Sequence, residues 1–349
     1  MAEHQDFEIV EQTLDKDSTV KLAKNIAAQS ELTSLTFESN KIEDEAAVCA
    51  LFQNLKAFDK LENLNIRQNK FTQRMVEALC EGIQHKKELR TVDLGENQID
   101  DKMIARIGEA LRSHVRLHML FLDNNNISAV GSVALSECLK NKQDLRVFNL
   151  DNNNIGAEGA ALLSEQLKNN YGLSKFYCDA NNIGGEGCEK LSECMEMMDS
   201  LKKVCLENNN IGDRGAIALS KALEDNDTLL SLHLENNNIS REGAYTLGEM
   251  ISNKYKLSKL NLNNNPIGDE GFSRIAKGIQ DIETLRIITL ANTQLTSESM
   301  PLLSKSLTNK RFLTKLVLDN NKIGSRGARV LSEGIRSNET LTNLHMANC

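Results

Sequence analysis

The sequence predicts an α/β solenoid in which a parallel β-sheet lines the concave face and helices cover the convex face. The first observation is an apolar pattern, LxxLxLxxN, that returns at a fixed spacing along the chain. The second is a helical pattern that follows it in each unit, so that strands and helices alternate. A fixed period of this kind is typical of repeat proteins, in which each unit buries its apolar side against its neighbours.

The repeat begins at a leucine in twelve places, and after one step of 29 residues every step is 28 residues. The starts are Leu32, Leu61, Leu89, Leu117, Leu145, Leu173, Leu201, Leu229, Leu257, Leu285, Leu313 and Leu341. Residues 1–31 hold a degenerate unit, which we expect to cap the N-terminal end. We therefore predict one continuous domain, with this capping repeat followed by twelve repeats over residues 32–349, the last of which lacks its helix.

The segment LRVFNLDNNNI, residues 145–155, shows why each unit begins with a strand. Phe148 and Leu150 alternate with the residues beside them, which is the period of a strand with one face buried. In the helical part of the same unit, Ala160, Leu163 and Leu167 are spaced by three and four residues and line one face. One strand and one helix per unit predict parallel pairing, because the crossover helix returns the chain to the same edge.

An asparagine stands at position 9 of ten units when the first leucine is position 1. A buried amide can donate and accept hydrogen bonds where the chain leaves the strand, and leaving those backbone groups unpaired would cost about 1–3 kcal/mol each. We predict a structural asparagine ladder made of Asn40, Asn69, Asn97, Asn125, Asn153, Asn181, Asn209, Asn237, Asn265 and Asn321. Thr293 breaks the ladder, so we expect a weaker and irregular unit after Leu285. The asparagines at positions 8 and 10 are expected to favour the turn.

Positions 3, 5 and 7 are expected to face the concavity, where a partner would be selected. Position 7 carries five consecutive acids, which are Asp123, Asp151, Asp179, Glu207 and Glu235. Strands lie about 4.8 Å apart, so like charges in a column destabilise the sheet by roughly 1 kcal/mol per neighbour. Two interpretations stay open. The column either binds a partner, or is a solvated repeat consensus that lysines at position 3, such as Lys175 and Lys203, neutralise.

Position 5 adds aromatic and imidazole side chains beside the acids, a composition typical of protein interfaces. The candidate partner-binding residues on the concave face are Phe121, Asp123, Asp151, Tyr177, Asp179, Glu207, His233 and Glu235. A net charge of −8 disfavours nucleic acid and anionic membranes and favours a partner with a basic surface. The sequence shows neither a secretion signal nor an apolar run of membrane-spanning length, and its eight cysteines form no CxxC pair, so we expect a cytoplasmic protein.

From Leu32 onward the units match LxxLxLxxNxIgxxGaxxLaxxL and resemble the ribonuclease-inhibitor type of leucine-rich repeat. That resemblance implies a horseshoe-shaped solenoid that acts as a scaffold, with activity carried by surface residues. The subfamily includes the ribonuclease inhibitor, Ran GTPase-activating proteins and the sensor arrays of nucleotide-binding immune receptors.

The six histidines are dispersed, and the sequence has neither an HExxH motif nor a Walker-type phosphate loop. We therefore expect no catalytic, metal or cofactor site, and a non-enzymatic scaffold that binds a protein partner. Two alternatives remain: a GTPase activator of the Ran type, although its long insertions are missing here, and a structural subunit of a large assembly such as a cytoskeletal one. The chain stops on a strand with Leu344 and Met346 at a sheet edge, so we expect either a fragment or another subunit that covers this end.

Overall fold

The computed structural model describes residues 5–29, 31–308, 310–336 and 338–349. Residues 1–4 and 30 of the predicted capping repeat lie outside the described residues. The chain forms two compact units. Unit 1 comprises residues 1–155 and 165–173, and unit 2 comprises residues 156–164 and 174–349.

In unit 1 the strands follow the chain order, and each pairs in parallel with the next. They are β1 (Gln5–Val10), β3 (Leu32–Glu38), β5 (Asn63–Asn65), β6 (Thr91–Asp93), β7 (Met119–Phe121) and β8 (Val147–Asn149). Two shorter strands, β2 (Thr13–Leu14) and β4 (Lys41–Ile42), pair in a small sheet of their own. The register joins residues one repeat apart, such as Thr91 with Met119.

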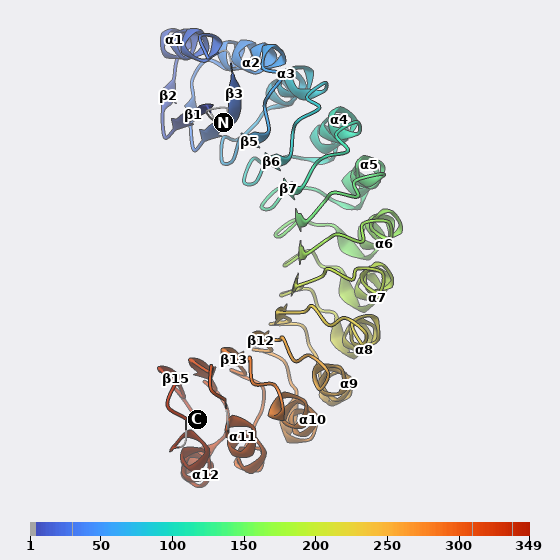
Figure 1. The fold of residues 1–349 in the computed structure, drawn as a ribbon, viewed down its shortest axis with the longest axis vertical. Helices are drawn as coiled ribbons and strands as arrows, with labels where there is room; N and C mark the ends of the chain where they lie inside the picture. The colour runs from blue at the N-terminus through green and yellow to red at the C-terminus, as the bar shows by residue number, and fades with distance from the viewer. Residues whose placement is uncertain (1–4, 30, 309, 337) are drawn as a thin grey trace. The chain divides into compact units, whose positions relative to one another are not determined.

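The helices of unit 1 lie along one face of its strands (Figure 1). They are α1 (Lys16–Ala27), α2 (Glu45–Asn54), the 3-10 turn η1 (Leu55–Ala57), α3 (Gln73–Ile83), α4 (Asp101–Leu111) and α5 (Ala129–Leu139). Side-chain caps set where several of them begin, because Asp44, Thr72 and Asp100 each accept a hydrogen bond from the backbone N–H three residues later. These caps thus fix where α2, α3 and α4 begin.

Unit 2 repeats this arrangement, again with parallel strands in chain order. Its strands are β9 (Lys175–Tyr177), β10 (Lys203–Cys205), β11 (Ser231–His233), β12 (Lys259–Asn261), β13 (Ile287–Thr289), β14 (Lys315–Val317) and β15 (Asn343–His345). Its helices are α7 (Gly184–Met195), α8 (Gly212–Ala222), α9 (Arg241–Ile251), α10 (Gly268–Gln280), α11 (Met300–Leu307) and α12 (Gly324–Arg336). Helix α6 (Gly156–Leu167) begins among the residues of unit 2 and ends among those of unit 1.

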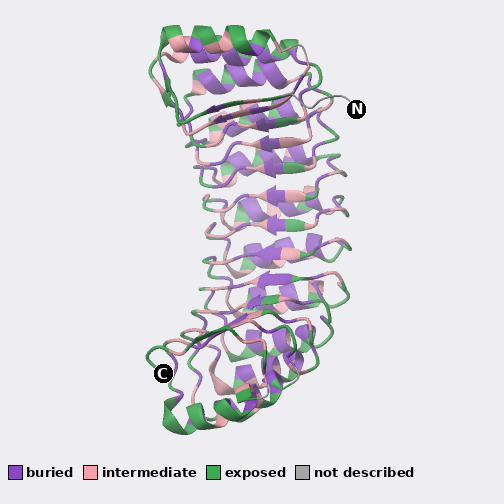
Figure 2. Ribbon diagram, turned by 60° about the vertical axis from the view of Figure 1, so that its left-hand side comes forward, coloured by how far each residue is buried: buried purple, intermediate pink, exposed green. Residues whose placement is uncertain are grey.

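The core lies between the strands and the helices of each unit, where Figure 2 shows the buried residues. In unit 2, this core includes Val204, Leu206, Ile211, Leu219 and Leu223, each of which is at most 1% exposed. Burying one such side chain stabilises the fold by about 1.5–3 kcal/mol. The predicted α/β solenoid, with a parallel sheet covered by helices on one face, is confirmed.

The position 9 asparagines hydrogen-bond from one repeat to the next. Asn97 donates through Nδ2 to the carbonyls of Ile66, Leu94 and Gly95, at 2.6, 3.0 and 3.1 Å. Its backbone N–H donates to Oδ1 of Asn125 at 3.1 Å. Each such amide therefore satisfies backbone groups of its own repeat and of its neighbours.

Nine of the ten predicted ladder residues are buried, at 0–7% exposure, and Asn153 is half-buried. Thr293 keeps one part of the pattern, since its N–H donates to Oδ1 of Asn321 at 3.1 Å. Its single hydroxyl hydrogen goes to the carbonyl of Leu290 at 2.6 Å, where an asparagine would supply two hydrogens. The same repeat has the short helix α11, of 8 residues against 11–13 in the other helices that lie wholly in unit 2.

Position 8 has a left-handed backbone in all twelve repeats, with φ between 51° and 61°. This conformation costs residues with a Cβ roughly 1–2 kcal/mol. The cost is lowest for asparagine, because its side-chain amide forms local hydrogen bonds with the backbone. Eight of the twelve residues at position 8 are asparagine. This turn explains part of the asparagine runs, and Ala180, with φ of 51°, is the member least suited to it.

A second set of buried polar residues occupies position 26, just before the next repeat, and the sequence pattern did not predict it. Lys86, Lys142, Lys254 and Lys310 are only 0–3% exposed. Each ammonium donates to a carbonyl at the end of the helical segment in the repeat before, at 2.8, 3.0, 2.7 and 2.6 Å. These carbonyls have no partner within their helix, and a cation is favoured at the helix C-terminus. His114 replaces the lysine in one repeat, with Nε2 3.0 Å from the carbonyl oxygen of Ile83.

Replacing Ala180 by asparagine should stabilise the protein. The substitution relieves a left-handed alanine, so we expect the free energy of unfolding to rise by about 0.5–1 kcal/mol in urea titrations. The reciprocal change, Asn152→Ala, should lower it, because Asn152 has φ of 55°. A neutral or destabilising Ala180→Asn would contradict this account of the turn.

A variant with lysine in place of His114 should lose less stability than the wild type when the pH is lowered. Burial lowers the pKa of His114 below its usual value of 6.5. At pH values between the lowered pKa and 6.5, His114 binds more protons in the unfolded state than in the folded state. The free energy of unfolding of the wild type therefore falls as the pH falls through 6.5. We expect His114→Lys to gain stability relative to the wild type as the pH falls from about 7.5 to about 5.5 in urea titrations. An equal difference at both pH values would exclude this role for His114.

Candidate functional site on the open face of the sheet

We call the side of the strands opposite the helices the open face, which carries positions 3, 5 and 7 of each repeat. The predicted binding residues belong to both units, so we describe each group within its own unit. Unit 1 contains Phe121, Asp123 and Asp151, and unit 2 contains Tyr177, Asp179, Glu207, His233 and Glu235. All of them are half-buried except Asp123, which is buried.

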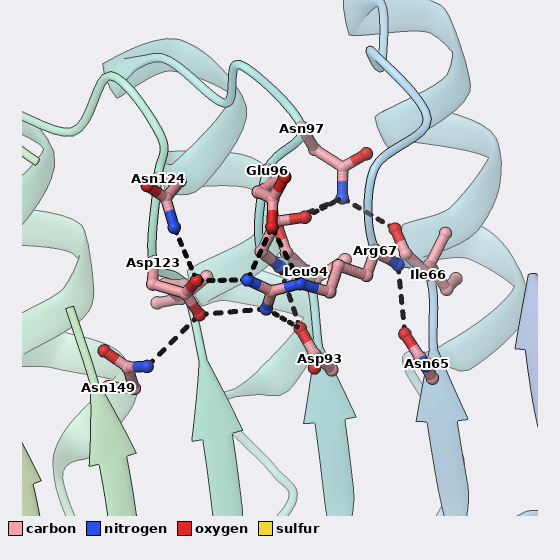
Figure 3. A network of polar contacts seen from close by, with 12 residues as sticks. Asn65, Ile66, Arg67, Asp93, Leu94, Glu96, Asn97, Asp123, Asn124 and Asn149 are labelled. Carbon is pink, nitrogen blue, oxygen red and sulfur yellow. Dashed lines mark hydrogen bonds and ion pairs between the residues drawn. The ribbon is translucent and has the colours of Figure 1, made fainter. Parts of the chain in front are cut away.

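In unit 1 a single guanidinium gathers three carboxylates (Figure 3). Arg67 contacts Asp123 through Nη1 at 3.1 Å and through Nη2 at 2.5 Å. It also contacts Glu96 at 2.8 Å and Asp93 at 3.4 Å. Asp123, at 4% exposure, is thus a member of an internal ion pair. Bidentate pairs of this kind are the stronger arginine–carboxylate contacts.

Gly95 makes this pair possible. Arg67, Gly95 and Asp123 occupy position 7 in three consecutive repeats, so the arginine crosses the middle repeat to reach the aspartate. A Cβ on Gly95 would lie 2.2 Å from Nη1 of Arg67. The sequence held a signal for the pair, because a glycine stands between an arginine and an acid in one column.

The charges of this cluster influence one another. Asp123 raises the pKa of Arg67 above its usual value, with a smaller contribution from Glu96. Burial raises the pKa of Asp93, against the effect of Arg67. Amide groups satisfy Asp123 further, since Asn124 and Asn149 donate to it at 2.8 and 3.3 Å.

In unit 2 the acids at position 7 are separated by hydrogen-bond donors. Nδ2 of Asn261 donates to Glu207 at 2.8 Å and to Glu235 at 2.9 Å. Nδ1 of His233 lies 3.2 Å from Glu207, and hydrogen bonding to His233 is the largest cause of the lowered pKa of that carboxyl. Oδ1 of Asp179 accepts a hydrogen bond from the backbone N–H of Glu207 at 2.6 Å. These donors offset the repulsion that a bare column of acids would have.

Lys203 is one of the position 3 lysines to which the second interpretation assigned neutralisation of the acids, and it contacts an aromatic ring. The ammonium of Lys203 lies 4.6 Å from the centre of the Tyr177 ring, which is a cation–π contact. Lys203 acts on Glu207 only as the last of the causes that lower its pKa. Asn261 and His233, to which the sequence pattern assigned no such task, are the nearer partners of the acids.

Within the described ranges, no group of three or more His, Cys, Asp or Glu side chains is placed to hold a metal ion. None of the helices in the part of the chain that the structure describes has the length and apolar character needed to cross a membrane. Seven cysteines are buried and Cys349 is exposed. Burial raises the pKa of Cys80 and of Cys188 to about 12, so these thiols stay protonated at neutral pH.

A leucine-rich repeat family model matches residues 141–164, 200–220, 225–248, 256–276 and 309–332. An internalin, inlF, from Listeria monocytogenes is structurally similar, with 22% identity and a TM-score of 0.56 over 91% of this chain and 81% of that chain. A chain from the yeast Rad7 and Elc1 complex is 18% identical, with a TM-score of 0.55 over 94% of this chain and 81% of that chain. No curated protein matches the sequence. At these identities the structures show a shared leucine-rich repeat fold.

Adding a methyl group at Gly95 should disrupt the Arg67 cluster. The new Cβ would displace Arg67 from Asp123, so we expect Gly95→Ala to lower the free energy of unfolding by about 1–3 kcal/mol. Gly172→Ala is the matched control, because a Cβ there would lie 2.0 Å from Nη1 of Arg146. That arginine side chain is 45% exposed and can move away. Equal losses in the two variants would refute the role of Gly95.

Proposed function

We propose that this leucine-rich repeat chain is a scaffold that binds a protein partner with a basic surface through the open face of its sheet. The observation that carries the proposal is the arrangement in unit 2. There, Asp179, Glu207 and Glu235 lie half-buried beside Tyr177 and His233, on a face that the helices leave uncovered.

The repeat architecture supports a binding role. Leucine-rich repeat proteins generally mediate protein–protein interactions, and the Rad7 structure is itself a complex with Elc1. A parallel sheet holds its open-face side chains on rigid strands, and hydrogen bonds orient several of the acids here. Such preorganisation lowers the conformational entropy lost on binding.

The ionisation of the acids supports a basic partner. The pKa of Glu207 is lowered, so its carboxylate is ionised at neutral pH. The amide of Asn261 fixes Glu207 and Glu235 with donors that carry no charge, so the negative charge of both stays available to a partner. An arginine that approaches the face can form charge-assisted bonds with these carboxylates, and such bonds are stronger than neutral ones.

The repeat type, the compartment and the role of the asparagines belong to the same proposal. The 28-residue unit with a full helix supports assignment of the repeats to the ribonuclease-inhibitor type. We assign the protein to the cytoplasm, where its thiols would stay reduced. The position 9 asparagines serve the fold and not the partner, since nine of them are buried beneath the turns.

Neutralising two of the acids should slow binding. We expect Asp179→Asn with Glu235→Gln to lower the association rate of a partner isolated by affinity purification about 3–10-fold at low salt, and to flatten its salt dependence. Both replacements keep the size of the side chain, and the amide introduced by Asp179→Asn could still accept the N–H of Glu207 through its oxygen.

The matched control carries Glu186→Gln and Glu196→Gln, which remove two charges of unit 2 from within and just after helix α7. Its association rate should stay within about twofold of the wild type. The rates can be measured by surface plasmon resonance between roughly 50 and roughly 500 mM salt, a range over which the screening of surface charges changes strongly. Equal slowing by both double variants would show that overall charge, and not the open face, attracts the partner.

A further inference from the structure

Three side chains on the open face of unit 2 form a connected hydrogen-bonded chain. Oγ of Ser231 lies 2.8 Å from Nε2 of His233, and Nδ1 of His233 lies 3.2 Å from Oε1 of Glu207. Ser231 and His233 are two residues apart on strand β11 and therefore share a face. Glu207 follows the neighbouring strand β10, so the parallel register brings the three together.

The hydrogen positions in this chain follow from the chemistry of the carboxylate. An ionised Glu207 can only accept, so Nδ1 of His233 carries the hydrogen that points to it. Nε2 is then unprotonated in the neutral imidazole and accepts the hydroxyl hydrogen of Ser231. A nucleophile within about 2.6–3.2 Å of a base, with the base oriented by a third group, is the signature of nucleophilic catalysis.

Neighbouring groups hold the carboxylate in place. Asn261 donates to Glu207 at 2.8 Å and accepts the hydroxyl hydrogen of Thr289 at 2.6 Å. The side chains of Glu207 and His233 are 22% and 23% exposed. The base is thus fixed by its surroundings, and Ser231 is a buried residue that keeps 7% exposure.

We propose that Ser231 is a nucleophile that accepts the acyl group of a small carboxylic ester, with His233 as general base and Glu207 as the residue that positions His233. This activity goes beyond protein binding and does not depend on it.

The reaction needs no cofactor. Oγ of Ser231 bonds to the carbonyl carbon of the ester, and its proton moves to Nε2 of His233. The bond from that carbon to the alkoxy oxygen breaks, and the leaving oxygen takes the proton from His233 to give an alcohol and acylated Ser231. Water then attacks the acyl carbon and passes its proton through His233 to Oγ of Ser231, which releases the carboxylic acid.

We assign the stabilisation of the oxyanion to lysine side chains. The backbone N–H of Ser231 donates to the carbonyl of Lys202 at 3.1 Å, so the strand already uses it. Lys203 and Lys259 stand in register with Ser231 on the strands at either side. Lys203 contacts the Tyr177 ring, whereas the side chain of Lys259 is exposed. A positive charge beside the reacting carbonyl stabilises the oxyanion and favours acyl groups that carry a negative charge.

The last repeat provides an internal comparison. The last two repeats carry the same arrangement of positions. Asp319 corresponds to Glu207, Asn343 to Ser231, and His345 to His233. Strand β15 also pairs with β14 in the register that joins β11 to β10. Asparagine stands in the place of the serine, so these two repeats together have the base and the acid but lack the nucleophile. A substitution at His345 therefore controls for the general effect of losing an open-face histidine.

The test uses the full chain with two probes, a fluorophosphonate that reacts with activated serines and p-nitrophenyl acetate. We expect the fluorophosphonate adduct on Ser231, located by mass spectrometry, and hydrolysis of the ester. Ser231→Ala should abolish the adduct, and His233→Gln should slow it at least about 100-fold. His345→Gln should react like the wild type.

Two variants test the other roles. Glu207→Gln should slow acylation and change its pH profile, because the amide no longer favours the productive tautomer of His233. Lys259→Met should slow ester hydrolysis more for a negatively charged acyl group than for acetate. Circular dichroism would verify that each variant is folded.

The labelling of the wild-type chain does not depend on the folding of any variant, so it decides the proposal. Folded wild-type protein that gives no adduct on Ser231 would overturn it. Labelling at an equal rate in His233→Gln would also overturn it, because the serine would then react without its base. An unchanged pH profile in Glu207→Gln would remove Glu207 from its positioning role.

Discussion

The hydrogen bonding of the chain where it leaves each strand is the constraint on which the rest of the structure depends. At that point the backbone turns through a left-handed residue and loses its strand partners, so the position 9 amide must supply the missing bonds. The amide of Asn97 reaches back 31 residues to Ile66, and Asn125 accepts the N–H of Asn97 from 28 residues away. An insertion near the turn would break both contacts, which explains why the 28-residue spacing is so regular.

The buried lysines at position 26 perform the complementary task at the other end of the repeat. Lys142 satisfies the carbonyl of Arg112 at the end of helix α4, where no N–H of that helix is available. Repeats that carry such a lysine are thus satisfied by inward-pointing side chains at the strand exit and at the helix end of the repeat before. The side chains at positions 3, 5 and 7 point to the open face, and only some of them, such as Asp179, accept a backbone N–H at a strand exit. They are free to differ between repeats, which is why both proposed activities lie on the open face.

The fold was predictable because it follows from periodicity. The strand alternation of Phe148 and Leu150 and the helical spacing of Leu163 and Leu167 repeat in every unit, so each unit supports the same interpretation. Lys142 and its equivalents escaped prediction because lysine is among the residues least often buried, and only the carbonyl beneath it explains its position. The partners of the acids escaped prediction for another reason. Arg67 pairs with Asp123 across an intervening repeat, for which Gly95 between them was the signal in the sequence. His233 meets Glu207 through the register of two strands, which a column of single positions does not show.

The contact across Gly95 has a consequence for how unit 1 unfolds. In a linear repeat array the stability is approximately a sum of terms for single repeats and for adjacent pairs, so ends can fray one repeat at a time. The ion pair between Arg67 and Asp123 joins repeats that are not adjacent, at residues 56 positions apart. It adds a coupling between second neighbours, so the repeat that contains Gly95 cannot open without loss of the pair that spans it. The three repeats from Leu61 to Asp144 therefore form a block of higher cooperativity within unit 1.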